Sequence, residues 1–124
     1  MHATLTFDHR TPIYRQVAGM IREAILAGDL PEGEAIPSVR QISVEQGLNP
    51  QTVLNATRLL LDEGILEKRR GIGVFVKQGA RAALMIRELE TFKGEEIPGL
   101  VSRARLLGLS SKETLGLIKD KFEE

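Results

Sequence analysis

The sequence predicts an α+β fold in which short helices dominate and one β-hairpin supplies the only sheet. Four observations predict it. An apolar pattern of helical period ends at Gly28, and two capped helices follow one another within residues 38–62. Two β-prone runs then flank a Gly-x-Gly turn at residues 71–73, and the chain beyond Gln78 carries helical stripes only.

The length and composition bound the organisation of the chain. Its 124 residues suffice for one domain with a short appendage, and we predict domains at residues 1–77 and 78–124. Cysteine is absent, which excludes disulfides and thiolate metal sites and fits a cytoplasmic protein. No apolar run approaches the length of a membrane span, and the first ten residues lack a signal-peptide profile.

The first predicted helix begins at Thr11-Pro12 and ends at Gly28. We expect Arg15, Arg22 and Glu23 to point to solvent. The segment before the helix contains Leu5 and Phe7, which either form a brief strand or pack on this helix. The apolar stripe consists of Ile13, Val17, Met20, Ile21, Ala24 and Ile25.

The link from Asp29 to Pro37 is rich in turn residues, and Leu30 and Ile36 are its expected buried side chains. A residue before proline prefers an extended backbone, so Ala35 and Ile36 could add a short strand to the sheet.

Residues 38–62 read as two helices joined by a tight turn. Ser38 and Gln41 form a capping box, and Gly47 suits the end of the first helix. Asn49 caps the second helix, and Pro50 fits its first turn. One helix therefore ends and another begins within about three residues, which is helix-turn-helix spacing.

The second of these helices separates into two faces. Val53, Ala56 and Leu60 form an apolar stripe for the core. Taken alone, the outer face is the solvated side of a core helix, but its groups also suit base edges and phosphates. That outer face carries Gln51, Asn55, Arg58 and Asp62.

A basic hairpin follows directly. Gly64 ends the helix, and strands are expected at Ile65–Arg70 and Val74–Lys77 around Gly71 and Gly73. Residues 36–77 hold six Lys or Arg against four acids, although the whole chain has a net charge of zero. A hairpin that carries Lys68, Arg69 and Arg70 beside a helix-turn-helix is the wing of a winged helix, placed to neutralise phosphate.

The run from Pro12 to Val76 resembles the N-terminal DNA-binding domain of the GntR family of bacterial transcription regulators. The turn Asn49-Pro50 and the short C-terminal region are similar to the YtrA-type subfamily. The motifs that carry the resemblance are Leu30-Pro31-x-Gly33, Pro37-Ser38-x-Arg40, Thr52-Val53, Glu63-Gly64 and Gly71-x-Gly73-x-Phe75-Val76.

The resemblance implies roles for matching positions. Arg40 would contact DNA from the first helix of the motif, and the glycines of the wing tip would enter the minor groove. Many relatives carry arginines at the positions of Pro50 and Leu54, and YtrA-like ones often carry a basic residue at the position of Asn55. This chain has none of these basic residues. The full predicted DNA-binding set is Ser38, Arg40, Asn49, Pro50, Gln51, Thr52, Asn55, Arg58, Arg69, Arg70, Gly71 and Gly73.

The tail is predicted to form three short amphipathic helices, which are too small to enclose a core of their own. We expect the stretch Gly94 to Pro98 to separate the first helix from the second. Ser110 and Glu113 are expected to form a capping box at the start of the third helix. A second copy of the chain is the expected partner, as the resemblance also implies. The stripes are Ala82, Met85, Ile86, Leu89 and Phe92; Leu100, Val101, Ala104 and Leu107; and Leu115, Ile118 and Phe122.

The sequence gives no sign of an enzyme or a cofactor. His2 and His9 have no companion at metal-ligand spacing and are expected at the surface. We therefore expect a sequence-specific, homodimeric transcription regulator, a repressor that binds a pseudo-palindromic DNA operator. The alternative is a winged-helix module for protein interaction without DNA binding; an RNA-binding module lacks the aromatic platform. Nothing in the tail sequence marks a pocket for a small-molecule effector.

Overall fold

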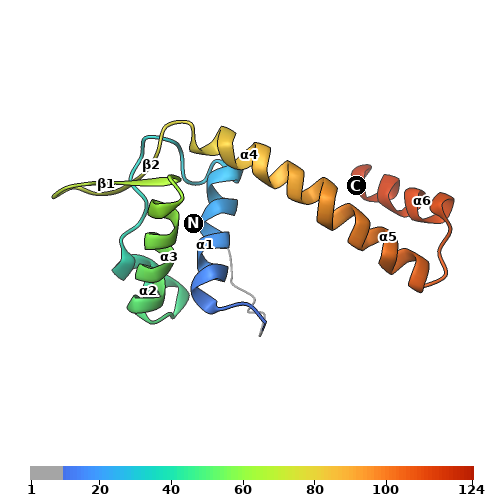
Figure 1. Ribbon diagram of the computed structural model, residues 1–124, viewed down its shortest axis with the longest axis horizontal. Coiled ribbons are helices and arrows are strands. Elements are labelled where there is room, and N and C mark those ends of the chain that lie inside the picture. The colour runs from blue at the N-terminus through green and yellow to red at the C-terminus, as the bar shows by residue number, and fades with distance from the viewer. Residues whose placement is uncertain (1–9) are drawn as a thin grey trace. The chain divides into compact units, whose positions relative to one another are not determined.

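The computed structural model of the chain describes residues 10–124 (Figure 1). The chain forms two compact units, Met1–Met85 and Ile86–Glu124. The predictions for Leu5, Phe7, His2 and His9 lie outside the described residues. The elements are α1 (Ile13–Ala27), α2 (Val39–Gln46), α3 (Pro50–Asp62), β1 (Leu66–Arg69), β2 (Gly73–Val76), α4 (Ala80–Thr91), the π-helical η1 (Phe92–Glu96), α5 (Ile97–Leu106) and α6 (Ser111–Phe122).

The core of the first unit lies between α1 and α3, which run side by side in Figure 1. Both helices bury the stripe that the sequence predicts, except that Ile13 is 47% exposed. Ile13 is the first residue of α1, ahead of the part of the helix that faces the core. The side chains that are fully excluded from solvent include Val17, Ile21, Ile25, Val53, Ala56 and Leu60.

The helix ends are capped as predicted. The Ser38 hydroxyl accepts a hydrogen bond from the Gln41 N–H at 3.1 Å, and the Gln41 side chain accepts one from the Ser38 N–H at 2.8 Å. Asn49 Oδ1 accepts from the Gln51 N–H at 2.8 Å. Gly47, with φ of 65°, adopts the left-handed conformation that ends α2 and turns the chain into α3.

The two strands pair antiparallel, with Leu66 opposite Val76 and Arg69 opposite Gly73. The first strand is two residues shorter than predicted, and the second has the predicted length but begins and ends one residue earlier. The link before α2 joins their edge, as expected: Ala35 pairs with Phe75, and the Ile36 N–H donates to the Val74 carbonyl at 2.9 Å. Leu30 and Ile36 are buried. This third segment ties the hairpin to the start of α2.

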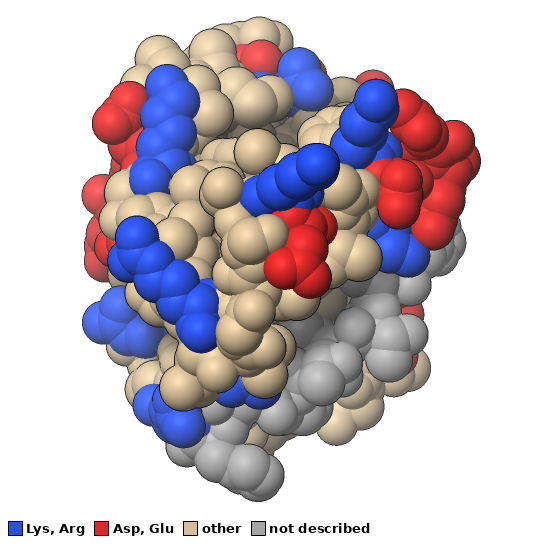
Figure 2. Space-filling view, turned by 90° about the vertical axis from the view of Figure 1, so that its right-hand side faces the viewer, with Lys and Arg blue, Asp and Glu red and all other residues tan. Residues whose placement is uncertain are grey.

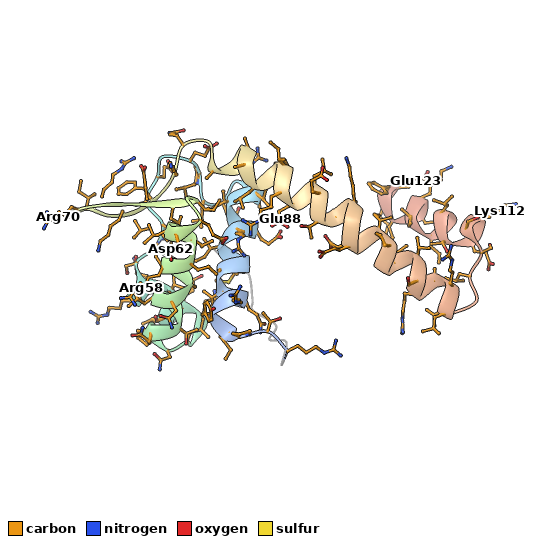
Figure 3. All side chains as sticks on the ribbon, viewed as in Figure 1. Arg58, Asp62, Arg70, Glu88, Lys112 and Glu123 are labelled. Atoms are coloured by element: carbon orange, nitrogen blue, oxygen red, sulfur yellow. The ribbon has the colours of Figure 1, made fainter. Side chains whose placement is uncertain are left out.

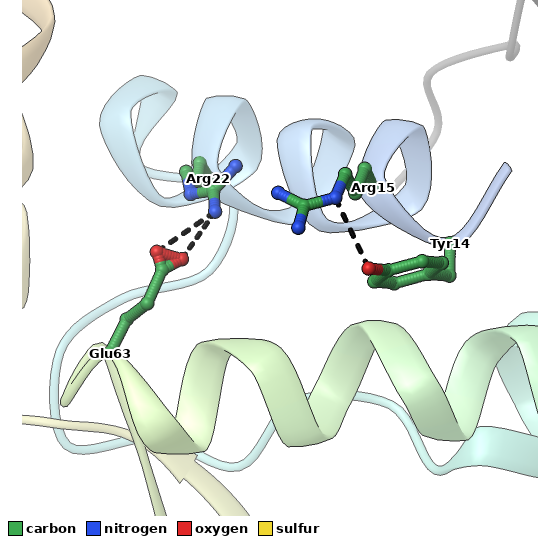
Figure 4. A network of polar contacts seen from close by, with 4 residues as sticks. All are labelled: Tyr14, Arg15, Arg22 and Glu63. Carbon is green, nitrogen blue, oxygen red and sulfur yellow. Dashed lines mark hydrogen bonds and ion pairs between the residues drawn. The ribbon is translucent and has the colours of Figure 1, made fainter. Parts of the chain in front are cut away.

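The sequence suggests that Arg22 points to solvent, but the structure shows that it does not. Its guanidinium forms an ion pair with Glu63 at the end of α3, and Nη2 donates to Glu63 Oε2 at 3.0 Å (Figure 4). The two side chains are only 16% and 19% exposed. The pair lies where α1 meets the end of α3, so a position that looks solvent-facing on α1 alone is covered by a neighbouring element.

Replacing Arg22 with alanine should lower the free energy of unfolding by about 1–3 kcal/mol, because the partly buried Glu63 carboxylate loses its cation. Urea denaturation measures the change. Arg15→Ala is the matched control, since Arg15 is exposed and, within residues 10–124, bonds only to Tyr14 (Figure 4). Equal free energies of unfolding for the two variants would show that the Arg22–Glu63 pair does not stabilise the fold.

The first turns of α4 belong to the first unit. Ala80 and Leu84 are buried in its core, whereas Met85 is 45% exposed and Ala82 is also exposed. The predicted stripe is therefore exposed in the single chain, where its pairing with a second copy stays a prediction, and the sequence analysis missed the opposite face that the first unit buries. The start of the helix is fixed because the Gly79 N–H donates to the Glu32 carboxylate and Arg81 Nε donates to the Leu26 carbonyl at 3.0 Å.

The predicted interruption at Gly94 to Pro98 is also wrong. Helical structure continues there as η1, in which the Ile97 N–H bonds to the Phe92 carbonyl, five residues back. A proline inside an α-helix clashes with the carbonyl four residues earlier. The wider π-turn changes the hydrogen-bond register just before Pro98, so that proline becomes a first-turn residue of α5.

The capping box of α6 forms as predicted. The Ser110 backbone N–H, and then its hydroxyl, stabilise the Glu113 carboxylate and hold its pKa below the usual value. A carboxyl group whose pKa is lower in the folded state than in the unfolded state stabilises the fold at pH values above its unfolded-state pKa. This stabilisation is lost as the pH falls through the folded-state pKa.

Ser110→Ala should therefore raise the pKa of Glu113 part of the way, because the backbone N–H at position 110 remains. NMR titration of the Glu113 side chain measures this, with Ser111→Ala as the neighbouring control. An unchanged Glu113 pKa in Ser110→Ala would contradict the assigned role of the hydroxyl.

Candidate nucleic-acid interface

Two helix N-termini lie at the surface of the first unit. Ser38 caps α2 and Asn49 caps α3, and both residues are exposed. Each end carries backbone N–H groups and the positive end of a helix dipole, which attract phosphate. Arg40, in the first turn of α2, is exposed and has no hydrogen bond or ion pair with any residue in the range 10–124.

The outer face of α3 carries polar groups that are close to one another. Gln51 Nε2 donates to Asn55 Oδ1 at 3.1 Å, so the two amides form a pair with unused donors and acceptors. Arg58 continues this face and is exposed, whereas Thr52 and Asn55 are half-buried. Pro50 is exposed but has no N–H to donate, so it offers van der Waals contact only.

The two arginines of the hairpin differ in their surroundings. Arg69 lies over the ring of Phe75, with its guanidinium carbon 4.0 Å from the ring centroid, and bonds Glu67 at 3.2 Å. Arg70 is exposed at the tip of the hairpin and has no partner within the described part of the chain. Figure 3 shows Arg70 at this tip and Arg58 projecting from α3 toward the same side of the view. Arg70 is therefore the hairpin arginine that is available to a ligand.

A hollow of about 320 Å³ separates the hairpin from the start of α2. Its lining includes Ser38 and Gln41 from α2, and Ile72 and Gly73 from the hairpin. A sugar-phosphate strand that passes between α3 and the hairpin would lie here, beside the α2 N-terminus. The hollow thus joins the two halves of the predicted site.

The structure brings Ser38 and Gly73 of the predicted set to one hollow, and Gly71 and Gly73 have positive φ of 75° and 144° in the hairpin turn. Sequence reasoning missed Ile72, which is 73% exposed between these glycines. Figure 2 shows a different face, the right-hand side of Figure 1, on which both basic and acidic side chains lie at the surface.

Two further classes of site were sought. Within residues 10–124 no group of His, Cys, Asp and Glu side chains is placed to hold a metal ion. In the same part of the chain, every helix is too short or too polar to cross a membrane.

Comparisons with known proteins agree with this geometry. The family model described as bacterial regulatory proteins, gntR family, matches residues 13–76. The HTH-type transcriptional repressor YtrA of Bacillus subtilis is 32% identical over 110 residues, which cover 89% of this chain and 84% of that protein.

Two solved structures extend the comparison. A GntR family transcriptional regulator from Listeria monocytogenes superposes with a TM-score of 0.74 over 92% of this chain and 98% of that one, and at 23% identity it shows the fold. The DNA-binding domain of AraR, solved in complex with operator ORX1, is 26% identical with a TM-score of 0.54, over 60% of this chain and 94% of that one.

Proposed function

The chain belongs to the GntR family of bacterial regulatory proteins, which are DNA-binding transcription regulators, and from this premise we propose that it represses transcription as a homodimer bound to a pseudo-palindromic operator. Its relatives are regulators, and the chain is not an enzyme. Operator DNA lies in the bacterial cytoplasm, which is where we place the protein.

The observation that carries the proposal is the exposure of two capped helix ends and a cationic hairpin tip, with the end of α2 and the hairpin lining one hollow. We assign Ser38, Asn49 and the N–H groups behind them to phosphate, and Arg40 to the DNA beside them. The amide pair of Gln51 and Asn55 is suited to adenine, because each amide can donate and accept at once.

The wing completes the contact. With α3 in a major groove, the hairpin tip reaches the neighbouring minor groove, and Gly71 and Gly73 allow a close backbone approach. Arg58 and Arg70 supply phosphate contacts on either side of the hollow. Arg69 acts mainly within the hairpin, where it stiffens the strands by packing on Phe75.

The second unit supports the proposed homodimer. A mostly apolar groove of about 330 Å³ lies between α5 and α6, and Leu100, Val101 and Leu115 line it. Exposed apolar side chains extend beyond the groove: Leu89 is 47% exposed and Phe122 is 87% exposed. A monomer rarely exposes so much apolar surface, so a second copy of the same unit is the proposed cover.

Repression is proposed because YtrA of Bacillus subtilis, similar over most of its length, is named a transcriptional repressor. A bound dimer blocks transcription by occupying the promoter. Its two α3 helices would enter successive major grooves about 34 Å apart.

A gel-shift with the promoter upstream of the protein's own gene tests the proposal. We expect a retarded complex whose affinity falls steeply as salt rises, because phosphate contacts release counterions. An unrelated promoter of equal length is the control. If neither duplex is retarded at low salt, the alternative of a winged-helix module for protein interaction replaces DNA binding.

A further inference from the structure

Ile72 stands at the tip of the hairpin and adds little to the core. Its side chain is 73% exposed, and it is held between Gly71 and Gly73, which both have positive φ. The Ile72 N–H donates to the Arg69 carbonyl at 3.0 Å and closes the turn. The tip therefore presents a large apolar side chain on a defined backbone.

The charge at this tip is simpler than the sequence suggests. Arg69 lies over Phe75 and pairs with Glu67, whereas Arg70, near Ile72, is exposed and has no ion pair or hydrogen bond within residues 10–124. The tip thus offers one cation and one apolar side chain. Proteins that bind the minor groove combine these two elements, basic side chains in the groove and apolar side chains inserted at its base steps.

We propose that Ile72 contacts the floor of the minor groove and makes the protein discriminate against G·C pairs there. The inference rests on the proposed DNA binding with α3 in the major groove. The hollow between the hairpin and α2 then receives the intervening sugar-phosphate strand, and Ile72, at the rim of that hollow, faces the next groove.

The chemistry of the groove floor gives the direction of the preference. Both kinds of base pair present acceptors in the minor groove, but only G·C adds the guanine 2-amino donor. An isoleucine side chain cannot accept a hydrogen bond, so it would desolvate that donor without compensation. An A·T pair carries no such group and leaves the floor free for the apolar contact.

Base substitution in a bound duplex tests this inference. A duplex selected by the parent protein from a random pool is probed by hydroxyl-radical cleavage to locate the minor-groove contact. The pairs there are then changed to A·T, inosine·cytosine or G·C. Inosine lacks the 2-amino group. An inosine·cytosine pair therefore presents the minor-groove groups of an A·T pair and the major-groove groups of a G·C pair.

We expect the parent to bind the A·T and inosine·cytosine duplexes alike and the G·C duplex about tenfold more weakly. Ile72→Ala should bind all three alike, and Ile72→Leu should restore the difference. Ile13→Ala removes an exposed isoleucine from α1 and should behave as the parent.

Two results would overturn the inference: equal binding of the inosine·cytosine and G·C duplexes, or full discrimination by Ile72→Ala. A selection that recovers no duplex would instead overturn the proposed function.

Discussion

Replacing Leu115 with aspartate should convert the proposed dimer into a monomer and lower its affinity for a palindromic operator by about 100-fold. Leu115 is 64% exposed and lines the apolar groove between α5 and α6. In a single chain the new carboxylate stays hydrated, so folding is little affected. In a dimer it would be buried against apolar side chains without a partner, which costs several kcal/mol.

The affinity falls because a monomer loses the second half-site contact, which in the dimer is intramolecular. Light scattering gives the mass of the variant, and fluorescence anisotropy gives its affinity for a palindromic duplex. Ser102→Asp introduces the same charge at an exposed α5 residue outside the groove and should remain dimeric. A dimeric Leu115→Asp with the parent's affinity would refute this interface.

The Arg40→Ala variant should bind operator about 1–3 kcal/mol more weakly per half-site, and its log–log salt dependence should be shallower by roughly one unit per half-site. Arg40 is exposed and unpaired among residues 10–124, so alanine removes no hydrogen bond or ion pair of α2. The loss therefore reports DNA contact rather than stability.

Anisotropy titrations across a range of salt concentrations measure both quantities. Arg15→Ala removes an equally exposed arginine from α1 and should match the parent in affinity and slope. An Arg40→Ala protein that binds DNA as tightly as the parent would contradict the proposed contact between α2 and DNA.

The first unit follows from local rules in the sequence. Ser38 with Gln41, and Asn49 with Pro50, fix where α2 and α3 begin, because capping depends on residues within one turn. The Gly-x-Gly turn places the hairpin in the same way. The winged helix-turn-helix was therefore predictable, and the similarity to the GntR family confirms it.

Contacts between distant segments were less predictable. Arg22 looks solvent-facing on its own helix, yet it pairs with Glu63, 41 residues away. The Arg69 side chain lies over Phe75 of the neighbouring strand, which the sequence did not suggest, and its contact with phosphate stays a prediction. In both cases the partner lies on another element, and helical or strand periodicity carries no information about it.

The tail shows a third reason for error. The stripe through Met85 and Leu89 is the more apolar face of α4, but the first unit buries Ala80 and Leu84. Periodicity finds apolar faces and cannot tell which neighbour each one meets. The faces left exposed in the single chain are the ones that the proposed dimer would cover, and their pairing stays a prediction.

Hydroxyl-radical footprinting of the parent protein on its own promoter, at low salt, is the most direct test of DNA recognition by paired winged helices. We predict two protected patches on each strand, related by two-fold symmetry and centred about 10 base pairs apart. A uniform cleavage pattern, or a single asymmetric patch, would contradict the paired docking of α3 and the hairpin.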